Sequence, residues 1–253
     1  MKISIITATY NSEKTIKETL DSVLSQTYKD YEHIIIDGLS KDGTMEIVKE
    51  YEKKYNGKLI YISEKDTGIY DAMNKGLKMA TGDIIGILNS DDKYANCHVL
   101  NNIVDRFQKT NCDGTYANLI FMDEETMKKT VRIWRNSTGK LEKGWHPAHP
   151  TLYLKKEVYD KIGDFNLKYR IVSDYDFMIR LMKEKSIKLE YIDEYIIHMR
   201  AGGTSTAGVK GYLKNLEESH RVLVDNKIKG PYLVDLRRIM KTLKEMLISK
   251  FKK

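Results

Sequence analysis

The chain has 253 residues, of which 41% are hydrophobic and 31% are charged, a composition typical of a globular protein rather than a disordered one. No segment reaches the roughly 18 uninterrupted apolar residues of a membrane-spanning helix. The apolar stretch at the N-terminus is too short for a secretory signal, so we expect a cytoplasmic protein. Cys97 and Cys112 lack metal-ligand spacing, and we expect free thiols.

The positive charge of the chain is confined to its C-terminal tail. The formal net charge is +7, and residues 227–253 contain nine Lys or Arg against two acids. The tail therefore accounts for the whole excess, and the other residues are neutral together. A neutral body argues against nucleic-acid binding.

The first hundred residues alternate between strand and helix patterns. Apolar runs predict buried strands at residues 3–7, 33–37, 59–62 and 84–88. Periodic apolar positions predict helices between them, the first capped by Asn11 and Ser12 and the third at residues 69–80. This alternation predicts an α/β fold with a mostly parallel sheet, in which ligands bind beyond the carboxyl ends of the strands.

The second half of the chain has a less regular rhythm. The pattern predicts the following elements: helices at residues 98–109, 155–161 and 174–185, and strands at 115–122, 129–135 and 189–192. A loop at residues 145–150 contains two of the three prolines, and residues 201–205 form a Gly-rich loop. The absence of repeats predicts one domain over residues 1–205 and a helical tail over 206–253.

The fourth predicted strand ends in two adjacent acids, Asp91 and Asp92, after Asn89 and Ser90. Neighbouring carboxylates repel each other, and a cation beside them removes that cost. Oxygen ligands favour Mg²⁺ or Mn²⁺ over zinc, and such ions commonly hold a diphosphate. The alternative is a polar turn after a strand, for which the same residue types are favoured.

Four motifs in this order resemble the family-2 glycosyltransferases. They are Thr-Ala-Thr-Tyr-Asn at residues 7–11, Ile-Asp-Gly-Leu-Ser-Lys-Asp-Gly-Thr at 36–44, Asp-Thr-Gly-Ile-Tyr-Asp-Ala-Met-Asn-Lys-Gly at 66–76, and Asn-Ser-Asp-Asp at 89–92. The resemblance covers residues 1 to about 205 and implies the GT-A fold, with a nucleotide-binding half (1–100) and an acceptor half (101–205). The chain has no Gln-x-x-Arg-Trp motif, so it resembles members that add a single sugar.

The resemblance implies which residues hold the donor, a nucleoside diphosphate sugar. Asp37 would contact the base, Thr9 and Asn11 the nucleotide, and Asp66 the base or ribose. The structural alternative for Asp37 is a strand-terminal acid that accepts turn amides. For Thr9 and Asn11 it is capping of the first helix.

The same resemblance implies which residues bind the metal ion. Asp92 would ligate Mg²⁺ or Mn²⁺, and Asp91 would face the ribose or the metal. The metal would neutralise charge on the departing diphosphate, a Lewis-acid contribution of several kcal/mol. His198, at the end of a predicted strand, is a candidate third ligand.

Inversion in a single displacement needs a general base, which contributes roughly 10²–10⁴-fold. The candidate is Asp174, which resembles the family's acidic motif at a helix start, and Asp176 is the alternative. Ser173 and Asp176 also have capping-box spacing, so this motif has a structural interpretation. The helix dipole would weaken such a base unless burial or the diphosphate opposed it.

The acceptor or the transferred sugar is expected to meet the loop before residue 151. Trp145, His146 and His149 could stack on a sugar or hydrogen-bond to it. Arg180 is a further candidate contact, although it could simply pair with Asp176 four residues earlier on a helix. Histidines in such positions are also common as structural residues.

The tail forms a basic amphipathic pattern. Apolar residues recur at helical spacing from Tyr232 to Phe251, and the other face carries the excess Lys and Arg. Such a helix can lie on anionic lipid at the inner face of the membrane, where a lipid-linked acceptor would be found. The alternative is that the apolar stripe packs on the body or on a second subunit as a homodimer.

The sequence therefore predicts an inverting, metal-dependent glycosyltransferase that acts on a saccharide or lipid-linked saccharide in cell-surface polysaccharide biosynthesis. One alternative is a nucleotidyltransferase, but its Arg/Lys-rich loop after the first strand is replaced here by Thr-Tyr-Asn-Ser. A second alternative is a non-catalytic nucleotide- or carbohydrate-binding module.

Overall fold

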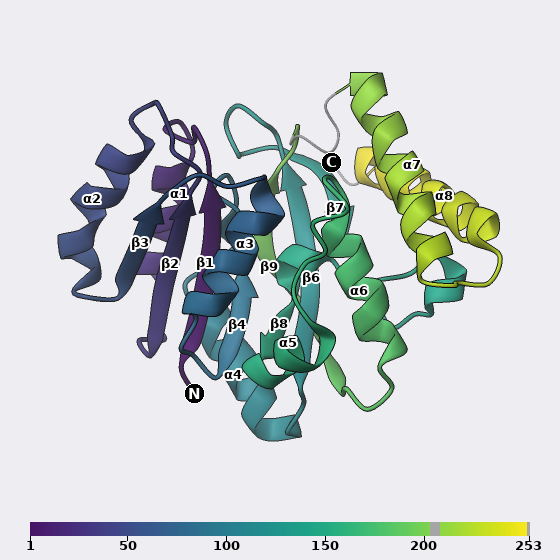
Figure 1. Ribbon diagram of the computed structural model, residues 1–253, viewed down its shortest axis with the longest axis horizontal. Helices are drawn as coiled ribbons and strands as arrows, with labels where there is room; N and C mark the ends of the chain where they lie inside the picture. The colour runs from purple at the N-terminus through teal and green to yellow at the C-terminus, as the bar shows by residue number, and fades with distance from the viewer. Residues whose placement is uncertain (203–207, 252–253) are drawn as a thin grey trace.

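A computed structural model describes residues 1–202 and 208–251. Its elements in chain order are β1 (Ile3–Thr9), α1 (Ile16–Leu24), β2 (Tyr31–Asp37), α2 (Thr44–Tyr55), β3 (Leu59–Ser63), α3 (Ile69–Met79), β4 (Ile84–Ile87), β5 (Lys93–Tyr94), α4 (Val99–Thr110), β6 (Gly114–Met122), β7 (Thr130–Trp134), β8 (Tyr153–Lys155), α5 (Lys156–Ile162), α6 (Ser173–Lys183), β9 (Leu189–Arg200), α7 (Gly208–Asp225) and α8 (Pro231–Phe251). Short 3-10 helices lie at Leu141–Lys143 and His149–Thr151. Figure 1 shows the central sheet with helices on both faces.

The N-terminal half is a parallel sheet in the order β3-β2-β1-β4. Its strands are continuous apolar runs because both faces are covered. Ile5 packs in the core under α1 and α2, whereas Ile6 packs in the core under α3. The pairing of Thr9 with Asp37 brings the carboxyl ends of β1 and β2 together.

The C-terminal half of the sheet is mixed. β8 runs antiparallel to both β4 and β6, β9 runs parallel to β6, and the short β5 is antiparallel to β9. The α/β fold class predicted from the sequence is confirmed, with the parallel part in the first half. β9 continues to Arg200, beyond the predicted end at residue 192. Asp193 and Glu194, which are exposed, interrupt its apolar pattern where its register with β6 shifts.

The predicted cap of the first helix is wrong. Helix α1 begins at Ile16 after Thr15, and no side chain caps it. The Asn11 side chain instead accepts a hydrogen bond from the Lys41 amide at 2.9 Å. Asn11 therefore ties the loop after β1 to the loop after β2.

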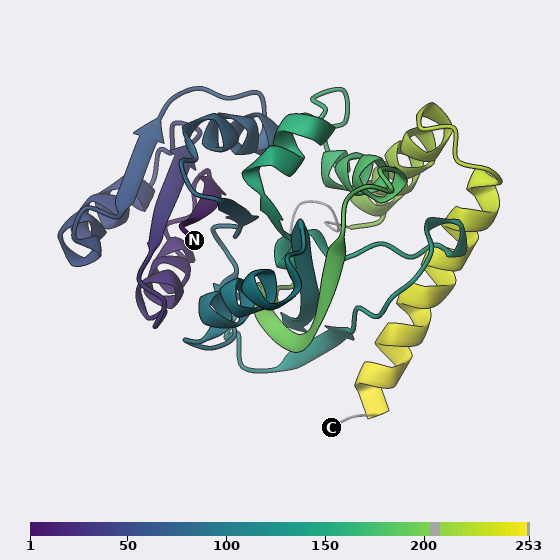
Figure 2. The same cartoon turned by 90° about the horizontal axis from the view of Figure 1, so that it is seen from below.

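The tail helices pack against the acceptor half. Helix α8 lies along β7 and the turn at Leu141–Lys143, and Figure 2 shows it along the side of the molecule remote from β3. No helix among the described residues is long and apolar enough to cross a membrane. The predicted domain boundary between residues 205 and 206 lies outside the described residues, as does much of the predicted loop at 201–205.

The orientation of α8 contradicts the alternative that its apolar stripe packs on the body. Charged residues of the helix, among them Asp235, Arg238 and Lys241, face the protein. The large apolar side chains that are exposed on the described part of α8 are Tyr232, Leu233, Leu236, Met240, Leu243 and Met246. The helix thus presents its apolar face to solvent.

Candidate active site

Asp37 ends β2 at the edge of the parallel sheet and is fully buried. Its carboxylate accepts hydrogen bonds from the Ser40 amide (3.1 Å), the Ser40 hydroxyl (2.5 Å) and the Ser63 hydroxyl (2.5 Å). Asp37 therefore accepts a hydrogen bond from an amide of the turn that follows it, as its structural alternative predicted, and the amide is that of Ser40. Beside it, the buried hydroxyl of Thr9 has no hydrogen-bond partner in the part of the chain that the structure describes, and such a group is expected to meet a ligand or water.

Three loops meet at this edge through short polar contacts. The Asn11 amide donates to Ser40 Oγ at 2.8 Å, and Ser12 Oγ lies 2.9 Å from Ser90 Oγ. Asp66 accepts from the Gly68 amide and lies against Gly38, where an added Cβ would be 2.5 Å from Asp66 Oδ2. Thr9, Asn11, Asp37, Asp66 and the residue before Asp91 therefore gather at one rim, as the motifs predicted.

Asp92 is a buried carboxylate, 1% exposed, just after β4. It accepts hydrogen bonds from the Arg200 amide at Oδ1 and the Asn89 side chain at Oδ2, both at 2.9 Å. Burial, followed by the charge of Asp91, raises the pKa of Asp92 to about 8. Burial also raises the pKa of Asp91, and the Arg200 charge opposes this shift. The two acids thus form a site where positive charge is strongly favoured.

Arg200, at the start of the Gly-rich loop that the sequence predicts, also lies at this site, although the sequence does not predict its contact with the two acids. Its guanidinium approaches the Asp91 carbonyl oxygen (3.4 Å) and pairs with Glu18 (3.3 Å), and it also contacts the Glu124 carbonyl. Arg200 is brought here by the unpredicted part of β9 and lies 109 residues from Asp91. The pairing of β5 with β9 brings these segments together, so no local pattern could have revealed the contact.

Hard carboxylate oxygens at Asp91 and Asp92 fit Mg²⁺ or Mn²⁺ by their chemistry. Among the described residues, no three His, Cys, Asp or Glu side chains lie close enough together to hold a metal ion. Asp91, Asp92 and His198 therefore do not form a set of three ligands in this structure. That residue lies on β9 opposite Lys93, and burial lowers its pKa. Two carboxylates suffice for Mg²⁺, which usually takes its other ligands from substrate phosphates and water.

Asp174 lies in the first turn of α6 and faces α3. The Tyr70 hydroxyl lies 2.9 Å from Asp174 Oδ1 and 2.8 Å from the Ile171 carbonyl oxygen. Burial, followed by the Asp174 carboxylate, raises the pKa of Tyr70 well above its usual value. Since α3 follows Asp66, the contact joins the donor rim to Asp174.

Asp176 is placed differently and is 3% exposed. One oxygen pairs with Arg180 Nε at 2.9 Å, and the other accepts from the Asn226 side chain at 2.8 Å. The Arg180 guanidinium also donates to the carbonyls of Ile162 and Asp164. Both residues thus join α6 to its neighbours, as the ion-pair alternative for Arg180 predicted. The capping box does not form, because the Ser173 hydroxyl donates to the Asn166 carbonyl.

The loop before β8 brings aromatic groups beside α6. His149 is buried against Phe165, and burial lowers its pKa while the Asp174 charge opposes this shift. His146 packs its ring 5.0 Å from that of Tyr175. Trp145 packs against Tyr116, and its indole N–H is buried without a hydrogen-bond partner.

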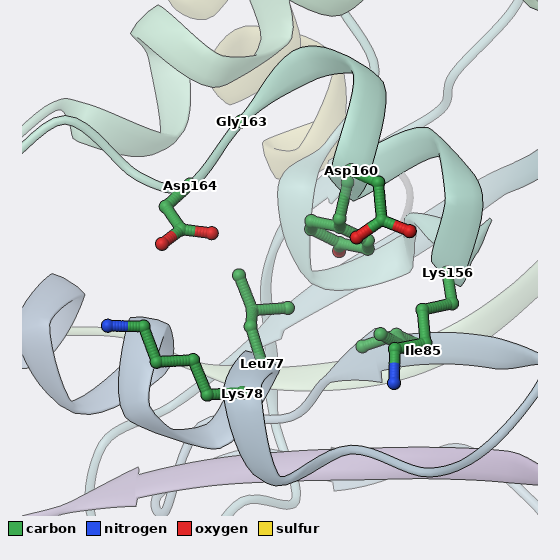
Figure 3. Close-up of a pocket in the computed structure, with 8 residues that line it drawn as sticks. Leu77, Lys78, Ile85, Lys156, Asp160, Gly163 and Asp164 are labelled. Carbon is green, nitrogen blue, oxygen red and sulfur yellow. The ribbon is translucent and has the colours of Figure 1, made fainter.

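A surface pocket of about 400 Å³ lies elsewhere, between α3 and α5. Figure 3 shows Leu77, Lys78, Asp160 and Asp164 around it. None of the predicted site residues lines this pocket, so it has no part in the site built at the sheet edge.

Comparison with known proteins agrees with this arrangement. The model of the family described as "Glycosyl transferase family 2" matches residues 4–188. A PGL/p-HBAD biosynthesis glycosyltransferase of Mycobacterium bovis (strain BCG / Pasteur 1173P2) is 29% identical, over 87% of this chain and 85% of its own. The putative glycosyltransferase EpsE of Bacillus subtilis (strain 168) is 27% identical, over 72% of this chain and 67% of its own.

Two solved structures have the same fold. The S. aureus TarS fragment 1–349 in complex with UDP-GlcNAc has a TM-score of 0.69 at 22% identity, covering 88% of this chain and 66% of the fragment. The mannosyltransferase PcManGT from Pyrobaculum calidifontis in complex with GDP-Man and Mn²⁺ has a TM-score of 0.70 at 16% identity, covering 98% of this chain and 73% of its own. The fold is GT-A, and the family model spans most of the domain. The chain belongs to glycosyl transferase family 2.

Proposed function

We propose that this glycosyltransferase moves one sugar, with inversion, from a nucleoside diphosphate sugar to an acceptor hydroxyl. The observation that carries the proposal is the buried Asp92 carboxylate, next to Asp91 at the same rim as Thr9 and Asp37. A site of this kind favours a cation and, with it, a diphosphate. Relatives of the same fold have been seen with UDP-GlcNAc and with GDP-Man and Mn²⁺, which supports a nucleotide sugar as donor.

In the proposed site, Asp92 and Asp91 hold Mg²⁺ or Mn²⁺. When bound, the metal supplies Lewis-acid stabilisation of the leaving diphosphate. The Thr9 hydroxyl, which has no hydrogen-bond partner among the described residues, binds the nucleotide. Asp37 and Asp66 lie on the side of the base and the ribose. Asn11 acts by holding the loop after β1 in place, since its side-chain oxygen already binds the Lys41 amide.

Asp174 is the proposed general base, which takes the proton from the attacking hydroxyl. It is half-buried, and among the described residues one side chain, that of Tyr70, hydrogen-bonds to it, at Oδ1. The other oxygen of Asp174 is therefore left for an acceptor, whereas both oxygens of Asp176 are already bonded. His149 lies close enough to sense the Asp174 charge, and we assign it and Trp145 to the acceptor side.

We further propose that the enzyme works at the inner face of the cell membrane on a saccharide or lipid-linked saccharide of a surface polysaccharide. The support is the exposed apolar row on α8, including Leu236, Met240 and Leu243, flanked by the exposed Arg237 and Lys244. Apolar side chains beside basic ones match an anionic lipid surface.

The membrane proposal is tested by sedimentation with vesicles. The full chain should sediment with phosphatidylglycerol vesicles, and Met240→Glu should abolish this vesicle binding. Dimerisation without vesicle binding would contradict the membrane assignment.

The transfer proposal is tested by thermal-shift screening of a panel of nucleotide sugars, each with and without Mn²⁺. The proposal predicts that at least one nucleoside diphosphate sugar raises the melting temperature, and that Mn²⁺ enlarges the shift. Donor hydrolysis assays then identify the transferred sugar. The absence of a shift with every nucleotide sugar, in both conditions, would overturn the assignment.

A further inference from the structure

A cluster of cations and aromatic rings lies between β7, the loop before β8, α6 and α8. Its cations are Arg132, Arg238 and Lys241, and its rings are those of Trp134, His146 and Tyr175; we call it the aromatic–cationic cluster. Its neighbours in the chain link it to the proposed acceptor side, because Tyr175 follows Asp174 and His146 follows Trp145.

The members of the cluster are in contact from one side to the other. The Trp134 and His146 rings lie 5.5 Å apart, and those of His146 and Tyr175 lie 5.0 Å apart. The Arg238 guanidinium carbon lies 3.8 Å from the centre of the Tyr175 ring. Lys241 Nζ lies 5.7 Å from the Trp134 ring centre, and the Arg132 guanidinium carbon 5.4 Å from it.

The positive charge of the cluster is only loosely paired. Arg132 Nε and Lys241 Nζ each lie 3.9 Å from a Glu245 oxygen, and an Arg238 nitrogen lies 3.8 Å from Asp235. These distances exceed the 2.7–2.9 Å of a charge-assisted hydrogen bond. Among the residues that the structure describes, these three cations share two acids, and Asp235 also pairs with His220 at 2.7 Å. The cluster therefore keeps an excess of positive charge.

The cluster also contains hydrogen-bond donors that are shielded from water and have no acceptor among the described residues. Arg132 Nε and the Trp134 indole nitrogen are buried and have no hydrogen-bond partner among the described residues. Burial, together with repulsion from Arg132 and Arg238, lowers the pKa of Lys241 despite the opposing Glu245 charge. Burial lowers the pKa of His146 to about 3, and the positive charges of Arg238 and Lys241 contribute to this shift. Buried unsatisfied donors beside mutually repelling cations form a site that an anion would stabilise.

We propose that the aromatic–cationic cluster is a subsite for a negatively charged group on the acceptor, a phosphate or a carboxylate, with the half-buried rings of Trp134 and His146 packing against the sugar that carries it. The inference rests on the proposed transfer to an acceptor hydroxyl at Asp174. Arginine suits this role because its guanidinium binds oxyanions and stacks on rings at the same time. Helix α8 thereby contributes to acceptor recognition, since two of the three cations come from it.

The chain offers a direct optical test, because Trp134 and Trp145 are its two tryptophans and one lies in the cluster and the other adjoins it. Tryptophan emission of the full chain is titrated with glucose 6-phosphate, with glucuronate and with neutral methyl glucoside. We expect a saturable change with at least one charged sugar and none with methyl glucoside. The charged sugar that responds identifies phosphate or carboxylate as the recognised group.

Lys241→Met and Lys244→Met form a matched pair on one helix, since Lys241 belongs to the cluster and Lys244 is exposed. Lys241→Met should weaken charged-sugar binding at least fivefold, while Lys244→Met should leave it within twofold of the unaltered chain. Arg238→Gln provides a second cluster variant should Lys241→Met fail to fold. Equal responses to charged and neutral sugars, no response to any, or equal effects of the matched substitutions would overturn the subsite.

Calorimetric titration of the same proteins with uridine and guanosine diphosphates in Mn²⁺ separates this inference from the proposed function. Nucleotide binding that persists in Lys241→Met, together with lost charged-sugar binding, supports the subsite. A chain that binds a nucleoside diphosphate but gives no charged-sugar response overturns the subsite alone. A chain that binds neither nucleotide, and none of the nucleotide sugars in the thermal-shift panel, overturns the proposed function, whatever the tryptophan response.

Discussion

The Tyr70 hydroxyl lies 2.9 Å from Asp174 Oδ1, across 104 residues of sequence. Tyr70 belongs to the helix that follows the donor motif at Asp66, and Asp174 lies in the first turn of α6. The contact joins the two halves of the domain between the proposed donor site and the proposed general base. It fixes the carboxylate of the proposed base relative to the proposed nucleotide site.

Tyr70→Phe should lower kcat about tenfold, since a hydrogen bond to a charged group contributes roughly 1.5–3 kcal/mol. Tyr70 is a positioning residue in this account, so the KM for the donor should stay within about twofold. The measurement is steady-state kinetics with the donor found by screening. A large rise in donor KM with unchanged kcat would indicate that Tyr70 binds nucleotide instead.

Asp174→Asn should reduce turnover by roughly 10²–10⁴-fold, the usual contribution of a general base. Donor affinity, measured by calorimetry, should be unchanged because Asp174 lies on the acceptor side. Asp176→Asn is the matched control two residues away. It should lower the free energy of unfolding by about 3 kcal/mol, because it leaves the buried Arg180 pair incomplete, while the folded fraction keeps its kcat. The reverse pattern would assign the base to Asp176.

Asp92→Asn should abolish the Mn²⁺-dependent part of nucleotide binding. Without metal, the same substitution should raise the melting temperature at pH 7 by a few degrees, because it removes the cost of protonating a buried acid whose pKa is raised to about 8. Calorimetry and thermal unfolding of the metal-free protein test both effects. Asp105→Asn, at an exposed acid on α4, serves as the control and should change neither. Undiminished Mn²⁺-dependent binding in Asp92→Asn would exclude Asp92 as the ligand.

His33 makes the fold sensitive to acid. It is fully buried between Thr7 and Tyr55, and burial lowers its pKa to about 3. The unfolded chain takes up a proton below about pH 6.5 but the folded chain does not, so stability is full above pH 6.5 and falls as the pH drops toward 3. At pH 5 the loss from His33 is about 2 kcal/mol.

Urea unfolding at pH 7 and pH 5 measures this loss. His33→Gln should show a smaller decrease between the two pH values than the unaltered chain. His146, whose pKa is also lowered to about 3, should supply a further part of the decrease. His98→Gln, at an exposed histidine, is the control. An identical decrease in His33→Gln and the unaltered chain would show that His33 does not contribute.

Local patterns were sufficient for the first half of the fold. The apolar runs of β1, β2 and β4 and the acids at their ends follow a strand-then-turn pattern that needs no distant partner. Asn74 and Gly76, inside the third motif, serve packing between elements. Asn74 exchanges two hydrogen bonds with the Phe165 backbone, and a Cβ at Gly76 would lie 2.4 Å from Ile6.

Features that depend on distant pairing could not be predicted in this way. β5 has only two residues and exists because β9 lies beside it. Arg200 reaches Asp91 and Asp92 through that same pairing. The hydrophobic pattern of α8 predicted the helix but left open whether its apolar face meets the body, a second subunit or a membrane. An amphipathic pattern does not specify which face meets the body when charged partners such as Arg132 lie there.

The central claim is that Asp92 and Asp91 hold a divalent cation at the donor rim. Anomalous scattering from Mn²⁺ in crystals grown with a nucleoside diphosphate tests this most directly. The account predicts one strong anomalous peak within coordination distance of the Asp92 carboxylate, with the diphosphate beside it and the nucleoside toward Asp37. A diphosphate bound with its Mn²⁺ away from both acids, or bound outside the rim formed by Thr9 and Asp37, would contradict the account.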